Sequence, residues 1–195
     1  MTDYVLSDET RAKYKRISTA SIATQLYKRG LRNQFIQGVQ PVAAKSANMV
    51  GQAFTLRYIP AREDRNPIEV FRNADHPQRV AVETCPAGHV LVMDARGDSS
   101  AATAGSILVT RMAVRGCAGL VTDGGLRDFE GIGALDMPAY AARPSAPTNL
   151  TKHEALDINV PIACGEVAVF PGDVLVGDRD GVMVIPAHLS DEIAE

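Results

Sequence analysis

The sequence has few of the side chains from which metal centres and disulfide frameworks are built. Its 195 residues include three cysteines, Cys85, Cys117 and Cys164, which are widely spaced and odd in number. They form no Cys-x-x-Cys pair, and no histidine stands at a zinc-ligand spacing from them. These absences argue against a structural zinc site and a disulfide framework, so we expect the cysteines to be reduced residues of the core.

Histidine is equally sparse. The four histidines, His76, His89, His153 and His188, are dispersed along the chain, and no histidine-based catalytic triad is visible. We expect each of them to be a surface or packed residue rather than a ligand or a base.

Long apolar runs and an excess of positive charge are also missing. No run approaches the roughly 20 apolar residues that span a bilayer, and the N-terminus lacks the charged and then apolar segments of a signal peptide. The formal net charge is −3 and the arginines are dispersed, so there is no basic footprint for nucleic acid. We therefore expect a cytoplasmic protein without nucleic-acid or membrane partners.

The composition and the hydrophobic periodicity predict one compact α/β domain. With 46% hydrophobic residues and no low-complexity tract, the chain can bury a sizeable core. Helices are expected over residues 8–16 and 77–84, and a third is expected to be capped by Ser18 or Thr19 and ended by Gly30. Short apolar runs predict strands over residues 53–58, 90–94, 138–142, 160–163, 174–176 and 182–185.

Residues 104–108 form the most informative loop of the chain. They lead into a segment of good helix formers, which we expect to end before Gly116. The first amides of a helix have no intrahelical acceptor, and the helix dipole is positive there, so the loop is predicted to hold a carboxylate or phosphate of a small acid. The amides concerned are those of Gly105, Ser106, Ile107 and Leu108.

A second polar segment follows the next predicted strand. This buried strand, residues 118–122, leads into an Asp-Gly-Gly turn and then to Arg127 and Asp128. Ligands of open α/β sheets bind at the carboxyl ends of strands, so we expect this turn and the loop at Gly105 to be neighbours. Arg127 offers a planar fork of donors to a carboxylate or keto oxygen, and Asp128 offers hard oxygens to Mg²⁺ or Mn²⁺. The alternative is a capping acid beside a solvated base.

Several segments match a known family when they are taken in order. They are Gly-Ser-Ile-Leu at 105–108, Gly-Cys-Ala-Gly-Leu-Val at 116–121, Asp-Gly-Gly-Leu-Arg-Asp at 123–128, and the stretches 17–23, 50–55 and 171–186. In this order they resemble the RraA-like and 4-hydroxy-4-methyl-2-oxoglutarate aldolase family, over most of the chain.

The resemblance implies a fold and an assembly. Members of this family have a three-layer β/β/α sandwich of the swivelling-domain kind, so we expect one such domain over residues 1–195. The sequence ends at residues 190–195 inside a predicted helix, where relatives often continue, and we expect it to lack that C-terminal helical extension. Family members form homotrimers or dimers of trimers, so the resemblance places the site near a subunit interface, where a carboxylate of the neighbouring subunit can complete it.

The resemblance also implies a class II aldolase, a lyase that cleaves 4-hydroxy-2-oxo acids to pyruvate. By this likeness the amides of residues 105–108 hold the carboxylate of a small 2-oxo acid, Arg127 contacts its oxygens, and Asp128 anchors a divalent metal, Mg²⁺ in preference to Mn²⁺. A pyruvate enolate stabilised by the cation would also support decarboxylation of oxaloacetate.

The sequence departs from the aldolase pattern at two positions. Ser106 stands where an acidic residue is usual, and Gly131 stands where aldolases often carry another carboxylate. Each departure removes a carboxylate that could contact a metal-bound water, the candidate proton carrier in this chemistry. The proton must therefore be transferred in another way than in the aldolases. By sequence position, Glu130, Asp123 and Asp98 are the candidates to take over acid/base duty, and each has a solvated or capping role as the alternative.

Basic residues offer two further roles, a second contact to a substrate carboxylate and a Schiff base. Arg57, Arg62 and Arg65 are candidates for a second carboxylate contact to a dicarboxylic substrate, with a solvated loop as the alternative. Lys45, if desolvated, would permit a metal-free aldolase that works through a Schiff base.

Two other functions remain open at this stage. Other members of the family are named as regulators that bind ribonuclease E, and they act by protein contact rather than catalysis. A related lyase or dehydratase acting on sugar-derived 2-oxo acids would use the same carboxylate cradle and metal.

Overall fold

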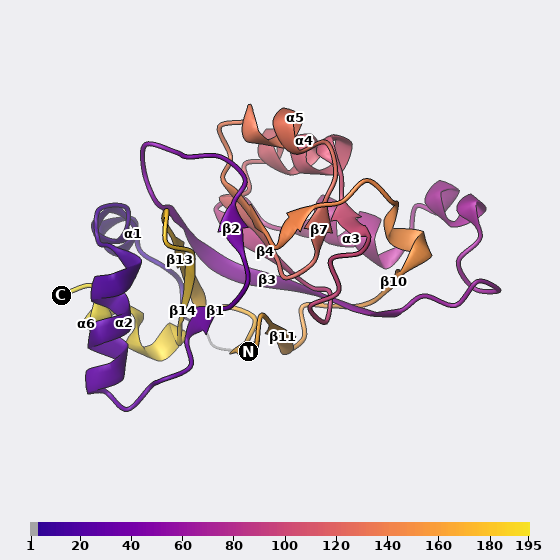
Figure 1. Ribbon diagram of the computed structural model, residues 1–195. Helices are drawn as coiled ribbons and strands as arrows, with labels where there is room; N and C mark the ends of the chain where they lie inside the picture. The colour runs from indigo at the N-terminus through magenta and orange to yellow at the C-terminus, as the bar shows by residue number, and fades with distance from the viewer. Residues whose placement is uncertain (1–3) are drawn as a thin grey trace.

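A computed structural model describes residues 4–195, and a curved sheet of nine strands forms its centre (Figure 1). Strands β3, β4, β6 and β8 run parallel to one another, whereas the remaining strands join antiparallel. From edge to edge the order is β1 (Phe35–Ile36), β14 (Val182–Ile185), β13 (Val174–Gly177), β3 (Met49–Pro60), β4 (His89–Asp94), β6 (Gly119–Thr122), β8 (Ala139–Ala141) and β2 (Gln40–Pro41), and β10 (His153–Ile158) also pairs with β3.

The two faces of the sheet are covered by different layers. Side chains alternate along a strand, so in β4 Leu91 and Met93 face one way and Val90 and Val92 the other. The first pair packs in a core with helices α3 (Pro77–Thr84), α4 (Ser106–Val114) and α5 (Phe129–Gly133). The second pair packs against the hairpin of β11 (Ile162–Cys164) and β12 (Val167–Val169). This helix, sheet and hairpin order confirms the predicted three-layer β/β/α sandwich.

A small parallel sheet, which the sequence pattern did not predict, connects the two polar segments. It consists of β5 (Ala102–Ala104), β7 (Gly125–Leu126) and β9 (Arg143–Pro144). Ala102 of β5 pairs with Gly125 of β7. A Cβ at Gly125 would lie 2.6 Å from the Cβ of Ser145 and 3.0 Å from the carbonyl oxygen of Ala101, so only glycine fits this close approach.

The helices follow the predicted signals closely. Helix α1 covers Asp8–Tyr14, two residues shorter than expected at its end, and α2 covers Thr19–Lys28. Ser18 caps α2, because its hydroxyl accepts from the backbone N–H of Ser21 at 3.2 Å. Short helical turns complete the chain at η1 (Ile68–Arg72), η2 (Asn149–Thr151), η3 (Ala187–Leu189) and α6 (Ser190–Ile193). Within residues 4–195, none of the helices has both the length and the apolar character needed to cross a bilayer.

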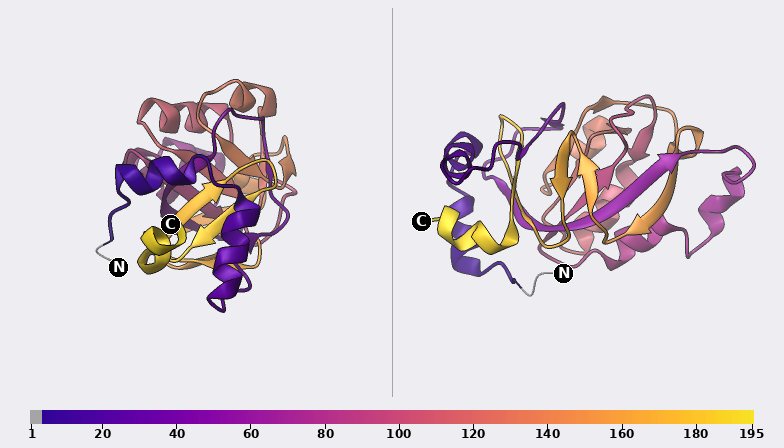
Figure 2. Two further views of the ribbon diagram at one scale, coloured as in Figure 1. Left: turned by 90° about the vertical axis from the view of Figure 1, so that its left-hand side faces the viewer. Right: turned by 90° about the horizontal axis from the view of Figure 1, so that it is seen from below.

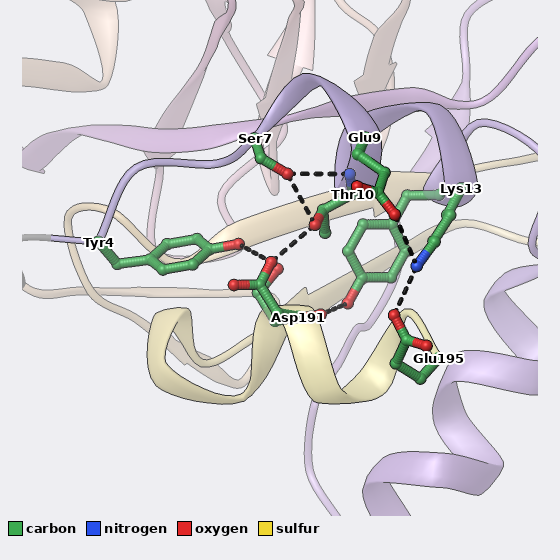
Figure 3. Close-up of polar contacts among 9 residues, drawn as sticks. Tyr4, Ser7, Glu9, Thr10, Lys13, Asp191 and Glu195 are labelled. Atoms are coloured by element: carbon green, nitrogen blue, oxygen red, sulfur yellow. Dashed lines mark hydrogen bonds and ion pairs between the residues drawn. The ribbon is translucent and has the colours of Figure 1, made fainter.

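The two ends of the described chain are held together by polar contacts. Helices α1, α2 and α6 gather at one end of the molecule (Figure 2). There the hydroxyls of Tyr4 and Thr10 both donate to Oδ1 of Asp191, at 2.9 and 2.6 Å (Figure 3). Lys13 Nζ pairs with Glu195 Oε1 at 2.5 Å. One carboxylate of α6 therefore joins two segments that are about 180 positions earlier in the sequence.

We expect Asp191→Ala to lower the free energy of unfolding by about 1 kcal/mol, because two hydroxyls lose their shared acceptor. For a chain of this size the melting temperature should fall by about 2–4 °C, as measured by circular dichroism. Asp180→Ala is the matched control, because the Asp180 side chain is exposed and, within residues 4–195, makes no hydrogen bond, whereas its backbone N–H donates to Asp178. Equal melting temperatures for the two variants would contradict a stabilising role for the Asp191 contacts.

Candidate functional site

The structure brings Arg127 and Asp128 directly onto Gly105. The pairing of β5 with β7 is extended by the backbone N–H of Arg127, which donates to the carbonyl of Ala104 at 3.1 Å. A Cβ at Gly105 would lie 2.7 Å from Nε of Arg127 and 3.0 Å from Oδ2 of Asp128. Two segments more than twenty residues apart thus form one site, and the absence of a side chain at Gly105 makes room for both charged groups.

Asp128 occupies a specialised position. Its backbone is left-handed (φ 57°, ψ 43°), a conformation uncommon outside glycine. It precedes α5, yet its side chain caps a different helix, because Oδ2 accepts from the backbone N–H of Ser106 at 3.1 Å and from the Ser106 hydroxyl at 3.0 Å. These hydrogen bonds, together with the charge of Arg127, hold the pKa of the Asp128 carboxyl below its usual value. Asp128 is therefore an ionised carboxylate at the N-terminus of α4.

Fewer backbone N–H groups at the start of α4 are therefore free to bind a substrate anion than the sequence predicted. The first intrahelical bond of α4 runs from Val109 to Gly105, at 3.2 Å, so the N–H groups of the first turn have no intrahelical acceptor. Asp128 uses the amide of Ser106. The amides of Ile107 and Leu108 remain to receive an external anion.

A cavity of about 350 Å³ opens beside this cluster. Its volume lies at the lower end of the range for small-molecule sites. It is lined by Gly105, Ile107, Leu108, Arg127 and Asp128 from the predicted site, by Ala102 and Ala104 of β5, and by Phe71, Asn73, His76, Gln78, Arg79, Thr148 and Asn149.

Two buried polar residues of the cavity lining, Gln78 and Asn149, were not predicted. Gln78 and Asn149 are 4% and 5% exposed, and the Asn149 amide donates to Oε1 of Gln78 at 3.0 Å. Gln78 Nε2 in turn donates to the carbonyl of Thr103 in β5. This chain of bonds ties α3 and η2 to β5, the strand that ends just before Gly105. The only sequence signal for these polar lining residues was the predicted helix start at Pro77, which places polar side chains in the first turn of α3.

The candidate proton carriers lie elsewhere. Glu130 is exposed on α5 and does not line the cavity. Asp123 accepts from the backbone N–H groups of Ala95 and Gly97, at 2.6 and 2.9 Å, so it holds a loop. Asp98 accepts from the backbone and hydroxyl of Ser100, which is the turn-forming alternative. The geometry of this chain therefore gives no support to acid/base duty for these three residues, and that role stays a prediction.

The basic residues also differ from expectation. The structure pairs Arg57 with Asp157, Arg62 with Asp64 at 2.6 Å, and Arg65 with Glu154 at 3.1 Å. None of these arginines lines the cavity, whereas Arg79 does and forms no ion pair with a carboxylate in residues 4–195.

Lys45 lies outside the cavity as well. Its Nζ donates to the carbonyl of Gly133, the last residue of α5, at 2.9 Å, and to the carbonyl of Leu135, just after the helix. It lines a separate cavity. The lysine thus stabilises the end of a helix, as cations commonly do, and the geometry gives no support to a Schiff base at Lys45.

The oxygen atoms of Asp128 suit a hard divalent cation. Among the described residues no group of three or more histidine, cysteine or carboxylate side chains is arranged to hold an ion. Asp128 is the acid that lines the cavity, and its Oδ1 accepts no hydrogen bond from residues 4–195. Mg²⁺ is commonly held by one or two carboxylates together with water and substrate oxygens, whereas structural zinc requires four protein ligands. The residues present therefore fit Mg²⁺ or Mn²⁺.

The comparison with known proteins agrees with this architecture. Residues 19–184 match the family described as RraA-like: Aldolase/RraA. A protein of Halalkalibacterium halodurans, provisionally named a 4-hydroxy-4-methyl-2-oxoglutarate aldolase, is 40% identical over 108 residues, which are 55% of this chain and 51% of that protein. A protein of Xanthomonas campestris with the same provisional name is 31% identical over 130 residues, 66% of this chain and 78% of its own length.

A solved structure extends the similarity to the whole fold. A Streptomyces coelicolor protein, described as an unusual member of the RNase ES inhibitor RraA protein family, superposes with a TM-score of 0.83 at 28% identity, over 96% of this chain and 89% of its own. The match to the Halalkalibacterium protein spans about half of that relative's length. Because the family match covers most of the sequence, the chain belongs to the RraA-like family.

Proposed function

We propose that this protein is a divalent-metal-dependent lyase that cleaves 4-hydroxy-2-oxo acids to pyruvate. The observation that carries the proposal is the packing of Arg127 and Asp128 on Gly105 at the mouth of a small cavity. The provisional aldolase names of the relatives point to the same chemistry.

Each residue of the cluster has a role in binding the substrate. The amides of Ile107 and Leu108 receive the substrate carboxylate at the positive end of α4. The guanidinium of Arg127 donates to the carboxylate and the 2-oxo oxygen, and it stabilises the negative charge that develops on that oxygen when the C3–C4 bond breaks. Gly105 allows Arg127 and Asp128 to pack against the backbone at the start of α4, next to these amides.

Asp128 is the residue that would hold the metal, through its uncommitted Oδ1. Mg²⁺ or Mn²⁺, when bound there, supplies a Lewis acid for the 2-oxo group. The pKa of Asp128 lies below its usual value, so the carboxylate keeps its charge across the neutral range. Because decarboxylation of oxaloacetate yields the same pyruvate enolate, the site supports that reaction too.

A second function is favoured by the solved relative and by the two departures from the aldolase pattern. The Streptomyces coelicolor protein is described as belonging to an RNase ES inhibitor family. A Cβ at Gly131 would lie 3.7 Å from that of Ser106, so the two positions without a carboxylate are neighbours beside Asp128. A chain that lacks both acids is a candidate for a regulator that acts by contact with a ribonuclease.

The deciding experiment measures pyruvate release from 4-hydroxy-2-oxo acids and from oxaloacetate. We expect turnover with Mg²⁺ or Mn²⁺, loss of turnover with EDTA, and recovery when the metal is restored. Activity that survives EDTA and is trapped by borohydride would instead indicate a Schiff-base enzyme. Absence of turnover, together with co-purification of a ribonuclease with the protein, would favour the regulator.

A further inference from the structure

His76 is a buried histidine whose ring makes no hydrogen bond to another of residues 4–195. It is 7% exposed, precedes the first turn of α3 and makes no side-chain capping bond. No side-chain hydrogen bond of His76 to another of residues 4–195 is present, and its ring nitrogens are not among the fully buried polar atoms without a partner, so they are accessible from outside the core. His76 lines the same cavity as Arg127 and Asp128. The imidazole is thus available to a molecule in the cavity.

The other buried histidine serves as a contrast. His153 is fully buried, its ring lies 5.6 Å from that of Tyr58, and its Nδ1 lies 3.2 Å from Arg96 Nη2. His153 does not line the cavity. Its Nε2 is buried without a hydrogen-bond partner among residues 4–195, so His153 is a packed residue, one of the two roles, surface or packed, that the sequence predicted for the histidines.

The surroundings of His76 keep its ring neutral. Burial lowers the pKa of His76, and Glu154 on β10 opposes this in part. Glu154 itself pairs with Arg65. The other charged groups of the cavity wall are Arg79 on α3 and the pair Arg127 and Asp128. At neutral pH the imidazole is therefore unprotonated and can accept a proton.

The reaction needs such a group. Cleavage of a 4-hydroxy-2-oxo acid requires a base for the C4 hydroxyl, and the positions of Ser106 and Gly131 supply no carboxylate. Glu130 lies outside the cavity. Asp128 is a weak base, because its hydrogen bonds to Ser106 favour the ionised form. General bases work best when their pKa is close to the operating pH, which favours an imidazole.

Building on the proposed aldolase function, we propose that His76 is a catalytic residue, the base that removes the proton from the C4 hydroxyl of the substrate. As that proton moves to the imidazole, the C3–C4 bond breaks, its electron pair forms the C2–C3 enolate of pyruvate, and C4 becomes a carbonyl. The imidazolium then returns the proton to C3, which gives pyruvate and restores the neutral histidine.

His76→Asn tests this assignment, with His188→Asn as the matched control, because His188 is exposed on η3 and does not line the cavity. We expect His76→Asn to lower kcat for a 4-hydroxy-2-oxo acid by about a hundredfold or more, with little change in KM. The wild-type kcat/KM should fall as the pH decreases through the His76 pKa, below about 6.5, and the variant should lack this limb.

Oxaloacetate provides the internal control, because its decarboxylation removes no hydroxyl proton. The same His76→Asn protein should decarboxylate oxaloacetate within about tenfold of the wild-type rate, which also shows that it is folded and that its site is intact. Equal loss of both reactions, or unchanged cleavage, would overturn the role of His76 while the proposed function stands. A wild-type protein inactive on both substrates would overturn the proposed function, and the role of His76 with it.

Discussion

Replacing Asp128 by asparagine is expected to reduce metal-dependent cleavage by about a thousandfold, the upper end of the effect of removing one electrostatic group from an active site. The amide keeps the shape of the side chain and an oxygen that can still accept from Ser106. It loses the negative charge that a hard cation requires. The loss should therefore come with weaker Mg²⁺ binding and a nearly unchanged fold, measured as activity against Mg²⁺ concentration and as thermal melting.

Asp136→Asn is the control for Asp128→Asn. Asp136 is exposed, follows α5 and lies outside the candidate cavity. The control should retain wild-type activity and the same Mg²⁺ dependence. If Asp128→Asn retained Mg²⁺-stimulated turnover close to that of this control, Asp128 would not be the metal ligand, and its role would be limited to capping α4.

Replacing Gly105 by alanine is expected to lower kcat/KM by about a hundredfold, because small displacements of positioned groups carry costs of this order. The added Cβ would lie 2.7 Å from Nε of Arg127 and 3.0 Å from its Cγ and from Oδ2 of Asp128. Gly105 has an extended backbone (φ −127°, ψ 178°) that alanine adopts without strain. Arg127 and Asp128 are exposed and can move aside, so the melting temperature should change little while the site is distorted.

Gly131→Ala is the matched control for Gly105→Ala. It adds the same methyl group next to the same site, where the nearest atom beyond its own helix is the Cβ of Ser106 at an ordinary 3.7 Å. Its activity should stay within about threefold of wild type, since no positioned group must move. If the two alanine variants lost activity equally, the close packing at Gly105 would not be what sets the geometry of the site.

The parts of the site that local signals encode could be predicted from the sequence. Gly105 precedes a run of helix formers that stops at Gly116, whose φ of +81° is the left-handed stop that glycine favours. Helix α3 covers the predicted residues 77–84. The apolar run before Asp123 is a buried strand. From these elements we expect the loop at Gly105 to lie near the turn at Arg127 and Asp128, because ligands of open α/β sheets bind at the carboxyl ends of strands. The pairing of β5 with β7, which makes the contact itself, was not predicted.

The parts that depend on contacts through space could not be predicted. Strands β5, β7 and β9 have only two or three residues each, too few for an alternating pattern. Asp128 caps α4 rather than its own helix, a contact across 22 positions. The cavity is lined by His76 and Gln78, at the start of α3, and by Asn149, in η2. In the sequence these are two separate polar segments that indicate only a helix start and a loop. Sequence reasoning therefore predicted His76 as packed or solvated, because the cavity that gives its ring a role forms only in the folded chain.

The most direct test of the site is an amide-resolved NMR titration of the ¹⁵N-labelled protein with pyruvate in the presence of Mg²⁺. If one small oxo acid is held between α4, Arg127 and Asp128, the amides of Ile107 and Leu108 and the Nε of Arg127 should shift together and saturate at one pyruvate concentration. In Asp128→Asn the same signals should respond only weakly. Saturable pyruvate binding that leaves the signals of Ile107, Leu108 and Arg127 unchanged would contradict the proposed site.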